Sequence, residues 1–243
     1  MIIAIVIGRK GSKGFPGKNI HQVFNKPLAQ YSIDVAKKTS LIDRIYLSTD
    51  DEELKKIGKK KKIEIIKRPK YLASNKALGE DAFLHAYKYI KKKEAKPIRY
   101  FVLLMCNSPT ISPLQINKGI KVLNRNKKID SAVTVSRYNM YSPLRARKIN
   151  NHGLLDPYLP FKYFGNENDL NCDRDSQGDV WFADMGCSIV RPSCLENIHS
   201  GLLPQKWMGK KIYPLKQEAG LDIDYEWQLP QIKWWIKNNK YGE

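Results

Sequence analysis

A cationic, glycine-rich loop at residues 8–19 holds the side chains of this chain that are best suited to chemistry. Glycine lets the backbone turn through positive φ and bring its N–H groups close to a ligand, and basic side chains add positive charge to the same concavity. The loop therefore predicts a polyphosphate ligand, with a plain surface loop of a lysine-rich protein as the alternative. Its glycines are Gly8, Gly11, Gly14 and Gly17, and its basic residues are Arg9, Lys10, Lys13 and Lys18.

Two widespread nucleotide-binding motifs do not fit this loop. The pattern G-x-x-x-x-G-K-[ST] fails because Pro16 stands where that motif needs a glycine, and the pattern G-x-G-x-x-G fails as well. The sequence therefore disfavours both a P-loop NTPase and a Rossmann dehydrogenase.

Two carboxylates near the other end of the chain, Asp222 and Asp224, flank the apolar Ile223. On an extended backbone, alternation sends both carboxylates to one face and Ile223 into the core. Carboxylates bind the divalent metal that a triphosphate needs. A D-x-D triplet alone indicates little, but together with the cationic loop it predicts a metal-dependent nucleotide site.

A buried strand should precede the loop, because residues 2–7 form a continuous apolar run that ends at a glycine. Ligands of open α/β sheets bind at such carboxyl ends of strands. Strands and helices then alternate, which predicts a doubly wound, mostly parallel α/β fold. Further strands are expected at residues 44–48, 63–66, 101–105, 130–135, 181–190 and 211–215, and helices at 27–38, 52–60, 79–93, 113–123 and after Pro192.

Helix ends carry their own signals. Thr49 or Asp50 can cap the helix at 52–60, and Ser112 can cap the helix that begins at Pro113. The tail at 224–236 is helix-like, and Pro230 should kink or restart it. We expect its tryptophans in the core or at a subunit interface rather than at a membrane surface.

Residues 136–180 interrupt the α/β rhythm, because they carry polar, proline and aromatic residues without a clear period. A stretch this long without regular structure inside a compact domain is usually functional. We interpret it as a lid or an oligomerisation arm inserted into a single domain that covers residues 1–243.

The net charge of +19 over 243 residues raises nucleic acid or an anionic membrane as partners. Much of the excess lies in lysine runs at 59–62 and 91–93, where helix ends explain them, so a nucleic-acid-binding protein stays only an alternative. The apolar start is too short for a signal peptide or a membrane span. Four cysteines without metal-ligand spacing predict reduced thiols in a cytoplasmic protein.

Residues 9–19 resemble the loop R-x-G-S-K-G-x-P-x-K-N of the CMP-sialic acid synthetases, or acylneuraminate cytidylyltransferases. Residues 48–51, 68–73 and 222–224 resemble the S-T-D-D, R-P-x-x-L-A and D-I-D segments of that family in the same order. The resemblance runs from residue 1 to about 229. It implies a nucleotide-diphospho-sugar transferase-like fold and transfer of CMP from CTP to the hydroxyl of an acidic sugar, with release of pyrophosphate.

The resemblance also implies roles for single residues, a Mg²⁺ cofactor and a homodimer. In that family, a basic residue at the position of Arg145 reaches the substrate from an arm that also forms the dimer. Arg174 lies near another such position. Arg9, Lys13, Lys18, Asp222 and Asp224 would be catalytic; Arg9, Gly11, Ser12, Lys13, Asn19 and Arg68 would bind the nucleotide; Met105, Arg145 and Arg174 would bind the acceptor; Asp222 and Asp224 would hold the metal.

Three departures from the family pattern replace polar residues, and two of them concern the acceptor. Met105 replaces a glutamine and Met185 an asparagine that face the sugar in the family, and Ile111 replaces an arginine. The loss of polar groups predicts an acceptor other than N-acetylneuraminate: another nonulosonate, a keto-deoxy acid such as keto-deoxyoctulosonate, or a phosphonate. An inactive relative is disfavoured, because the loop and both aspartates are present. Asp173, Arg174, Asp175, Asp179 and Asp184 could read the acceptor or form a solvated loop.

Overall fold

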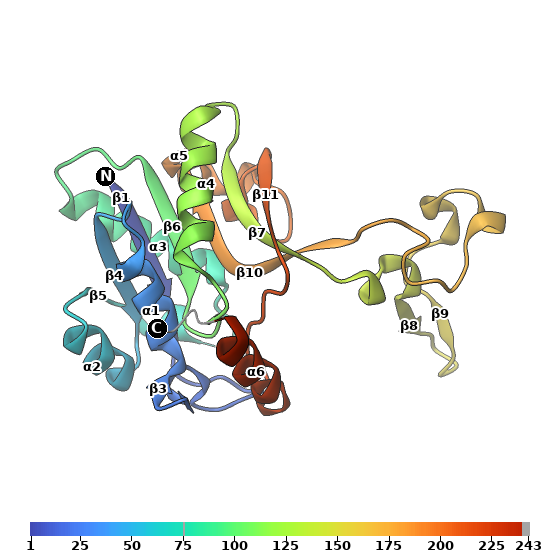
Figure 1. Ribbon diagram of the computed structural model, residues 1–243, viewed down its shortest axis with the longest axis horizontal. Helices are drawn as coiled ribbons and strands as arrows, with labels where there is room; N and C mark the ends of the chain where they lie inside the picture. The colour runs from blue at the N-terminus through green and yellow to red at the C-terminus, as the bar shows by residue number, and fades with distance from the viewer. Residues whose placement is uncertain (75, 240–243) are drawn as a thin grey trace.

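The computed structural model describes residues 1–74 and 76–239. Its centre is a seven-stranded sheet in the order β11-β7-β10-β6-β1-β4-β5 (Figure 1). Strand β10 runs antiparallel to β6 and β7, and the other pairs of this sheet are parallel, so the prediction of a mostly parallel sheet is confirmed. The strands are β1 (Ile2–Ile7), β4 (Arg44–Thr49), β5 (Glu64–Lys67), β6 (Tyr100–Met105), β7 (Ser131–Arg137), β10 (Trp181–Val190) and β11 (Ile212–Gln217).

Helices cover both faces of this sheet, and β1 shows why its sequence is apolar throughout. Ala4 and Val6 pack into the apolar cluster under the helices at 28–38, 52–60 and 113–125, whereas Ile3 and Ile5 pack into the cluster under the helices at 79–93 and 192–196. A strand buried on both faces needs an apolar residue at every position. The helices are α1 (Leu28–Lys38), α2 (Glu52–Lys60), α3 (Gly79–Lys93), α4 (Pro113–Arg125), α5 (Pro192–Glu196) and α6 (Leu229–Asn239).

The capping prediction is right for one helix and wrong for the other. Ser112 Oγ accepts a hydrogen bond from Gln115 N, as expected for α4. The cap of α2 is Asp51 rather than Thr49 or Asp50. Thr49 still belongs to β4, and the Asp50 carboxylate accepts a hydrogen bond from the backbone of Lys10 in the cationic loop.

The inserted segment between β7 and β10 leaves the body of the molecule as an extended arm (Figure 1). It contains an antiparallel hairpin of β8 (Arg147–Ile149) and β9 (Leu155–Pro157). Where the arm begins and ends, Tyr138 N donates to Val180 O at 3.0 Å and Val180 N donates to Asn139 Oδ1 at 2.9 Å. These bonds join the two chain segments that enter and leave the arm.

The carboxyl-terminal tail packs against the cationic loop. Phe15 of the loop shares an apolar cluster with Ile223 and with Ile232 and Ile236 of α6. Pro230 lies in the first turn of α6, which restarts after a short 3-10 helix, as the sequence predicts. Trp235 is buried as expected, whereas Trp227 and Trp234 are exposed.

Shorter elements complete the chain. A small hairpin follows the loop, formed by β2 (Gln22–Val23) and β3 (Lys26–Pro27). Within residues 1–74 and 76–239, no helix has both the length and the apolar character to span a membrane. The 3-10 helices are η1 (Lys18–Ile20), η2 (Lys70–Ala73), η3 (Asn139–Tyr141), η4 (Pro143–Arg145), η5 (Phe161–Phe164), η6 (Glu167–Asp169), η7 (Ile198–Ser200), η8 (Lys206–Met208) and η9 (Glu226–Gln228).

Candidate functional site

The cationic loop and the two aspartates meet at the carboxyl end of β1. Lys18 Nζ lies 2.6 Å from Asp224 Oδ1, across 206 positions of sequence. Gly14 packs so closely against the backbone oxygen of Asp224 that a Cβ atom there would lie 2.5 Å from it. Two segments that the sequence places at opposite ends of the chain therefore form one site.

The other side of the loop is fixed by Asp50, which follows β4, and by η2. Lys10 N donates to Asp50 Oδ1 at 3.0 Å, and Arg9 Nη1 donates to Ala73 O at 3.3 Å. Within the loop, Asn19 Nδ2 donates to Arg9 O at 3.2 Å. Asn19 Oδ1 is buried and has no hydrogen-bond partner among the residues that the structure describes. Gly11 and Lys13 lie on the exposed part of the loop, and Ser12 between them is half-buried.

Arg68 lies beneath this site at the end of β5. Its side chain is buried, with the residue 5% exposed, and Nη2 donates to Ser48 O at 2.8 Å. Burial lowers the pKa of the guanidinium, which still remains a cation at neutral pH. A buried positive charge next to the carboxyl ends of β4 and β5 adds to the attraction of this site for anions.

Asn107 holds the aspartate segment in place. Ile223 N donates to Asn107 O at 2.9 Å, and Asn107 Nδ2 donates to Ile223 O at 3.1 Å, with Asp222 Oδ2 at 3.4 Å. Burial raises the pKa of Asp222, and the neighbouring Asp224 raises it further. Sequence reasoning did not assign Asn107 to the site; the available signal was its position two residues after the end of central strand β6.

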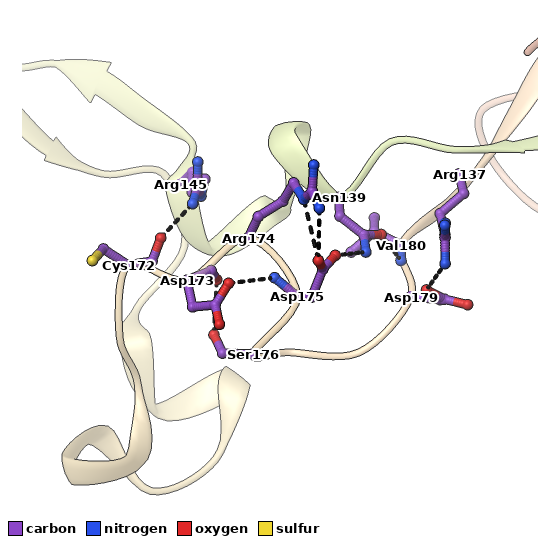
Figure 2. A network of polar contacts seen from close by, with 10 residues as sticks. All are labelled: Arg137, Asn139, Arg145, Cys172, Asp173, Arg174, Asp175, Ser176, Asp179 and Val180. Atoms are coloured by element: carbon purple, nitrogen blue, oxygen red, sulfur yellow. Dashed lines mark hydrogen bonds and ion pairs between the residues drawn. The ribbon is translucent and has the colours of Figure 1, made fainter.

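The residues expected to bind the acceptor lie in two places. Met105 and Met185 are partly buried and pack against the same apolar cluster on one face of the sheet. Arg145 and Arg174 lie on the arm, where Arg145 Nη2 donates to Cys172 O at 2.5 Å (Figure 2). The arm extends away from the body (Figure 1), so a single chain does not bring these two arginines to the loop.

The acidic cluster predicted around residue 175 divides into two environments. Arg174 pairs with Asp175 at 3.0 Å, and Arg137 pairs with Asp179 at 3.1 Å, on the exposed base of the arm (Figure 2). Asn139, followed by Arg174, lowers the pKa of Asp175 by hydrogen bonding to its carboxylate. Asp184 does not belong to this group, because it is buried in the sheet and bonded to neighbouring strands.

A groove of about 810 Å³ opens beside Asp222. Its walls come from the base of the arm, from β10, from residues 218–222 and from α6. Aromatic side chains, among them Tyr138, Phe182 and Trp227, line it together with Met185 and with the carboxylates of Asp184, Glu218 and Asp222. A groove with this lining favours a ligand that places apolar groups next to the Asp222 carboxylate.

Comparison with known proteins gives a consistent picture. A family model described as cytidylyltransferase matches residues 3–151. An N-acylneuraminate cytidylyltransferase of Escherichia coli is 30% identical over 225 residues, which is 92% of this chain and 49% of the relative. A Helicobacter pylori protein is 29% identical over 150 residues, 61% of this chain and 28% of its own length; its name combines a pseudaminic acid cytidylyltransferase with a hydrolase. The chain spans about half the length of the first relative and less of the second.

Solved structures share the fold over almost the whole chain. A CMP:2-keto-3-deoxy-manno-octonic acid synthetase complexed with CTP aligns with a TM-score of 0.68 and 14% identity, covering 97% of this chain and 98% of the other. A 4-diphosphocytidyl-2C-methyl-D-erythritol synthase from Anaerococcus prevotii aligns with a TM-score of 0.64 and 14% identity, covering 98% of both chains.

Proposed function

Because this chain belongs to the cytidylyltransferase family, we propose that it transfers CMP from CTP to the hydroxyl of an acidic sugar and releases pyrophosphate. The contact between Lys18 and Asp224 carries the proposal, since it joins a phosphate-binding loop to a pair of carboxylates. This contact supports a metal-dependent nucleotide site, because the loop and the two carboxylates are adjacent in one folded chain.

The loop binds the triphosphate in this proposal. Arg9, Lys13 and Lys18 neutralise its oxygens, and the backbone N–H groups at Gly11 and Ser12 add hydrogen bonds. The buried, unpartnered Oδ1 of Asn19 supports a nucleotide contact, because a buried acceptor without a donor is costly and a ligand N–H or O–H would satisfy it. Arg68 supports the loop from below as a buried cation.

Asp222 and Asp224 fit a Mg²⁺ ion that arrives with the nucleotide. Within the part of the chain that the structure describes, no three His, Cys, Asp or Glu residues form a metal cage. Mg²⁺ does not need one, since it binds through one or two carboxylates together with phosphate oxygens and water. When bound, the ion neutralises charge on the phosphates and the leaving pyrophosphate.

The protein contributes mainly positioning to this chemistry. In-line attack of the acceptor hydroxyl on the α-phosphorus needs the two reactants aligned and the charge on the phosphoryl oxygens balanced. Arg9, Lys13 and Lys18 supply that balance from the loop side. Asp222 is bonded to Asn107 and lines the groove, which supports a role between the acceptor and the nucleotide.

We propose that the acceptor is a nonulosonate, similar to sialic acid but not N-acetylneuraminate itself. The relatives named above act by name on N-acylneuraminate and on pseudaminic acid, and both are acidic sugars of this class. Met185 lines the groove and Met105 offers no hydrogen-bond donor, so the site is suited to apolar rather than hydroxyl or amide substituents. Keto-deoxyoctulosonate and phosphonates remain the alternative acceptors to be assayed.

We also propose a homodimer formed through the arm. The arm exposes large apolar side chains that a monomer would leave in water, which is typical of an interface. In such a dimer, Arg145 and Arg174 would serve the groove of the partner chain. The exposed apolar residues are Met140, Tyr141, Ile149, Leu154, Leu155, Tyr158, Leu159 and Tyr163.

Pyrophosphate release tests the reaction directly. The purified protein is incubated with Mg²⁺, each of the four nucleoside triphosphates in turn, and a panel of acidic sugars and phosphonates. We expect release only with CTP and a nonulosonate, and loss of release in Lys18→Met. Absence of turnover with CTP and every acidic acceptor would contradict the proposal, and sedimentation analysis of the same samples tests the dimer.

A further inference from the structure

A buried carboxylate lies in β10, and its hydrogen-bond partners among the described residues are all uncharged. Asp184 is 7% exposed, and its two oxygens accept four hydrogen bonds. Oδ1 accepts from Thr134 Oγ1 at 2.6 Å and from Gly186 N at 3.1 Å. Oδ2 accepts from Ser136 Oγ at 2.6 Å and from Gln217 Nε2 at 2.7 Å. Four donors fill the acceptor capacity of one ionised carboxylate.

The four donors come from three neighbouring strands at the point where the sheet is irregular. Thr134 and Ser136 belong to β7, Gln217 ends β11, and Gly186 lies in the bulge of β10. The register of β10 against β7 shifts at this bulge, where Met185 has a φ of 59°. Asp184 therefore joins β10 to β7 and β11 at the point where the backbone ladder between β10 and β7 is interrupted.

The same network continues to the segment that leads to Asp222. Ser136 Oγ, while it donates to Asp184, accepts a hydrogen bond from Gly220 N at 2.6 Å. Gly220 O accepts from Tyr138 OH at 2.7 Å, and Leu221 N donates to Thr110 Oγ1 at 3.1 Å. A Cβ atom on Gly220 would lie 2.2 Å from the carboxyl carbon of Asp184, so the backbone passes directly over this carboxylate.

We infer that Asp184 is a positioning residue for the metal site, acting through Ser136 and Gly220 on the course of residues 220–222. Asp184 contacts Gly220, and Gly220 precedes Asp222 by two residues. The inference rests on the proposed function, since it assigns Asp222 to the metal. Groups that orient metal ligands in this way usually change metal affinity rather than nucleotide affinity when they are altered.

The substitution D184N separates this role from a general contribution to folding. An amide has the size of a carboxylate, but an NH₂ group with two N–H donors replaces one of its two acceptor oxygens. Its NH₂ group cannot face Gly186 N, which only donates, so it must face Ser136 and Gln217. Gln217 can turn its own amide oxygen toward it, but the Ser136 proton loses its acceptor, and the bridge to Gly220 loosens.

D130N provides the matched control at the opposite end of the same strands. Asp130 Oδ2 accepts from the backbone N–H groups of Lys210 and Lys211, both at 2.8 Å, just before β11 begins. Loss of the Asp130 charge should lower the melting temperature without changing the position of Asp222. S136A is the second variant, because it removes the bridge to Gly220 and leaves Asp184 with three donors, so it reports on the same link if D184N fails to fold.

The experiment measures Mn²⁺ binding by electron paramagnetic resonance in the presence of a non-hydrolysable CTP analogue, together with analogue binding in EDTA and the melting temperature. We expect D184N to weaken Mn²⁺ binding by about 10- to 100-fold, S136A to weaken it less, and both to leave analogue binding in EDTA unchanged. D130N should change only the melting temperature.

Unchanged Mn²⁺ affinity in folded D184N, or in S136A where D184N does not fold, would overturn the positioning role. D222N is measured alongside. If D222N also binds Mn²⁺ like the wild type, the metal site itself is wrongly assigned, which is a failure of the proposed function. If D222N loses Mn²⁺ while D184N and S136A retain it, only the inference about Asp184 fails.

Discussion

Gly14 provides the sharpest test of whether the loop must lie against the aspartate segment. Alanine is compatible with its backbone, because Gly14 does not have a positive φ, so Gly14→Ala adds only a methyl group. That methyl would lie 2.5 Å from Asp224 O and 3.0 Å from the nearest carbon of the Tyr225 ring. One of the two segments must therefore move away from the other.

The size of the movement follows from the contact distance. An ordinary van der Waals contact begins at 3.4 Å, so the loop and residue 224 must separate by about 0.9 Å. Overpacking of this kind costs about 1–3 kcal/mol, which for a chain of this length lowers the melting temperature by about 2–4 °C per kcal/mol. A misplacement near 1 Å between groups that position a reaction lowers turnover by about 100-fold.

Pyrophosphate release and thermal unfolding measure the two effects separately. The control is Gly153→Ala on the arm, where φ is 75° and no atom lies within 4 Å of the added Cβ. Its cost is backbone strain of about 1–2 kcal/mol, so its melting temperature should fall while its turnover is retained. If Gly14→Ala kept wild-type turnover, the contact between the loop and the aspartate segment would not matter for catalysis.

Three other substitutions test single roles, and a fourth, at His85, tests a dependence of stability on pH. Asp222→Asn should abolish Mg²⁺-dependent pyrophosphate release with an unchanged circular dichroism spectrum, and retained release would remove Asp222 from the metal site. Arg145→Ala should raise the KM of the acidic sugar more than that of CTP; equal increases would contradict an acceptor role. Met105→Gln should allow some use of N-acetylneuraminate, and no gain would weaken the role of this position in acceptor choice. Burial, and then the charge of Arg68, lowers the pKa of His85 in the folded protein. The neutral side chain therefore favours the folded state above the usual pKa of histidine, and this contribution is lost as the pH falls through the lowered pKa. His85→Gln should therefore lose less thermal stability than the wild type between about pH 7 and about pH 5, and parallel melting curves would contradict this.

Most of the fold could be predicted because its signals are local. Residues 2–7 are apolar at every position, which indicates a strand buried on both faces, and the helix at 79–93 begins and ends where its periodicity predicts. Ser112 followed by Pro113 marks a helix start with residues that are adjacent in the sequence. Each of these signals depends on the residue itself and its nearest neighbours.

The site could be predicted less completely, because its contacts are long-range. The predicted cap of α2 was wrong because the Asp50 carboxylate accepts a hydrogen bond from Lys10, 40 positions away. Asp51 caps the helix instead. Asp184 resembles the exposed acids of the arm in the sequence, but the register shift in β10 turns it into the sheet. Such outcomes depend on which strands become neighbours, and no local pattern records that.

The ion pair between Lys18 and Asp224 has a thermodynamic consequence for the order of events at this site. In the proposed reaction Lys18 turns to the phosphates and Asp224 to the metal, so either arrival must first separate the same two charges. The ligand that binds second does not have to break the ion pair between Lys18 and Asp224, because the first ligand has already separated it. Nucleotide and metal should therefore bind with reciprocal, favourable coupling, beyond the attraction that they have for each other in solution.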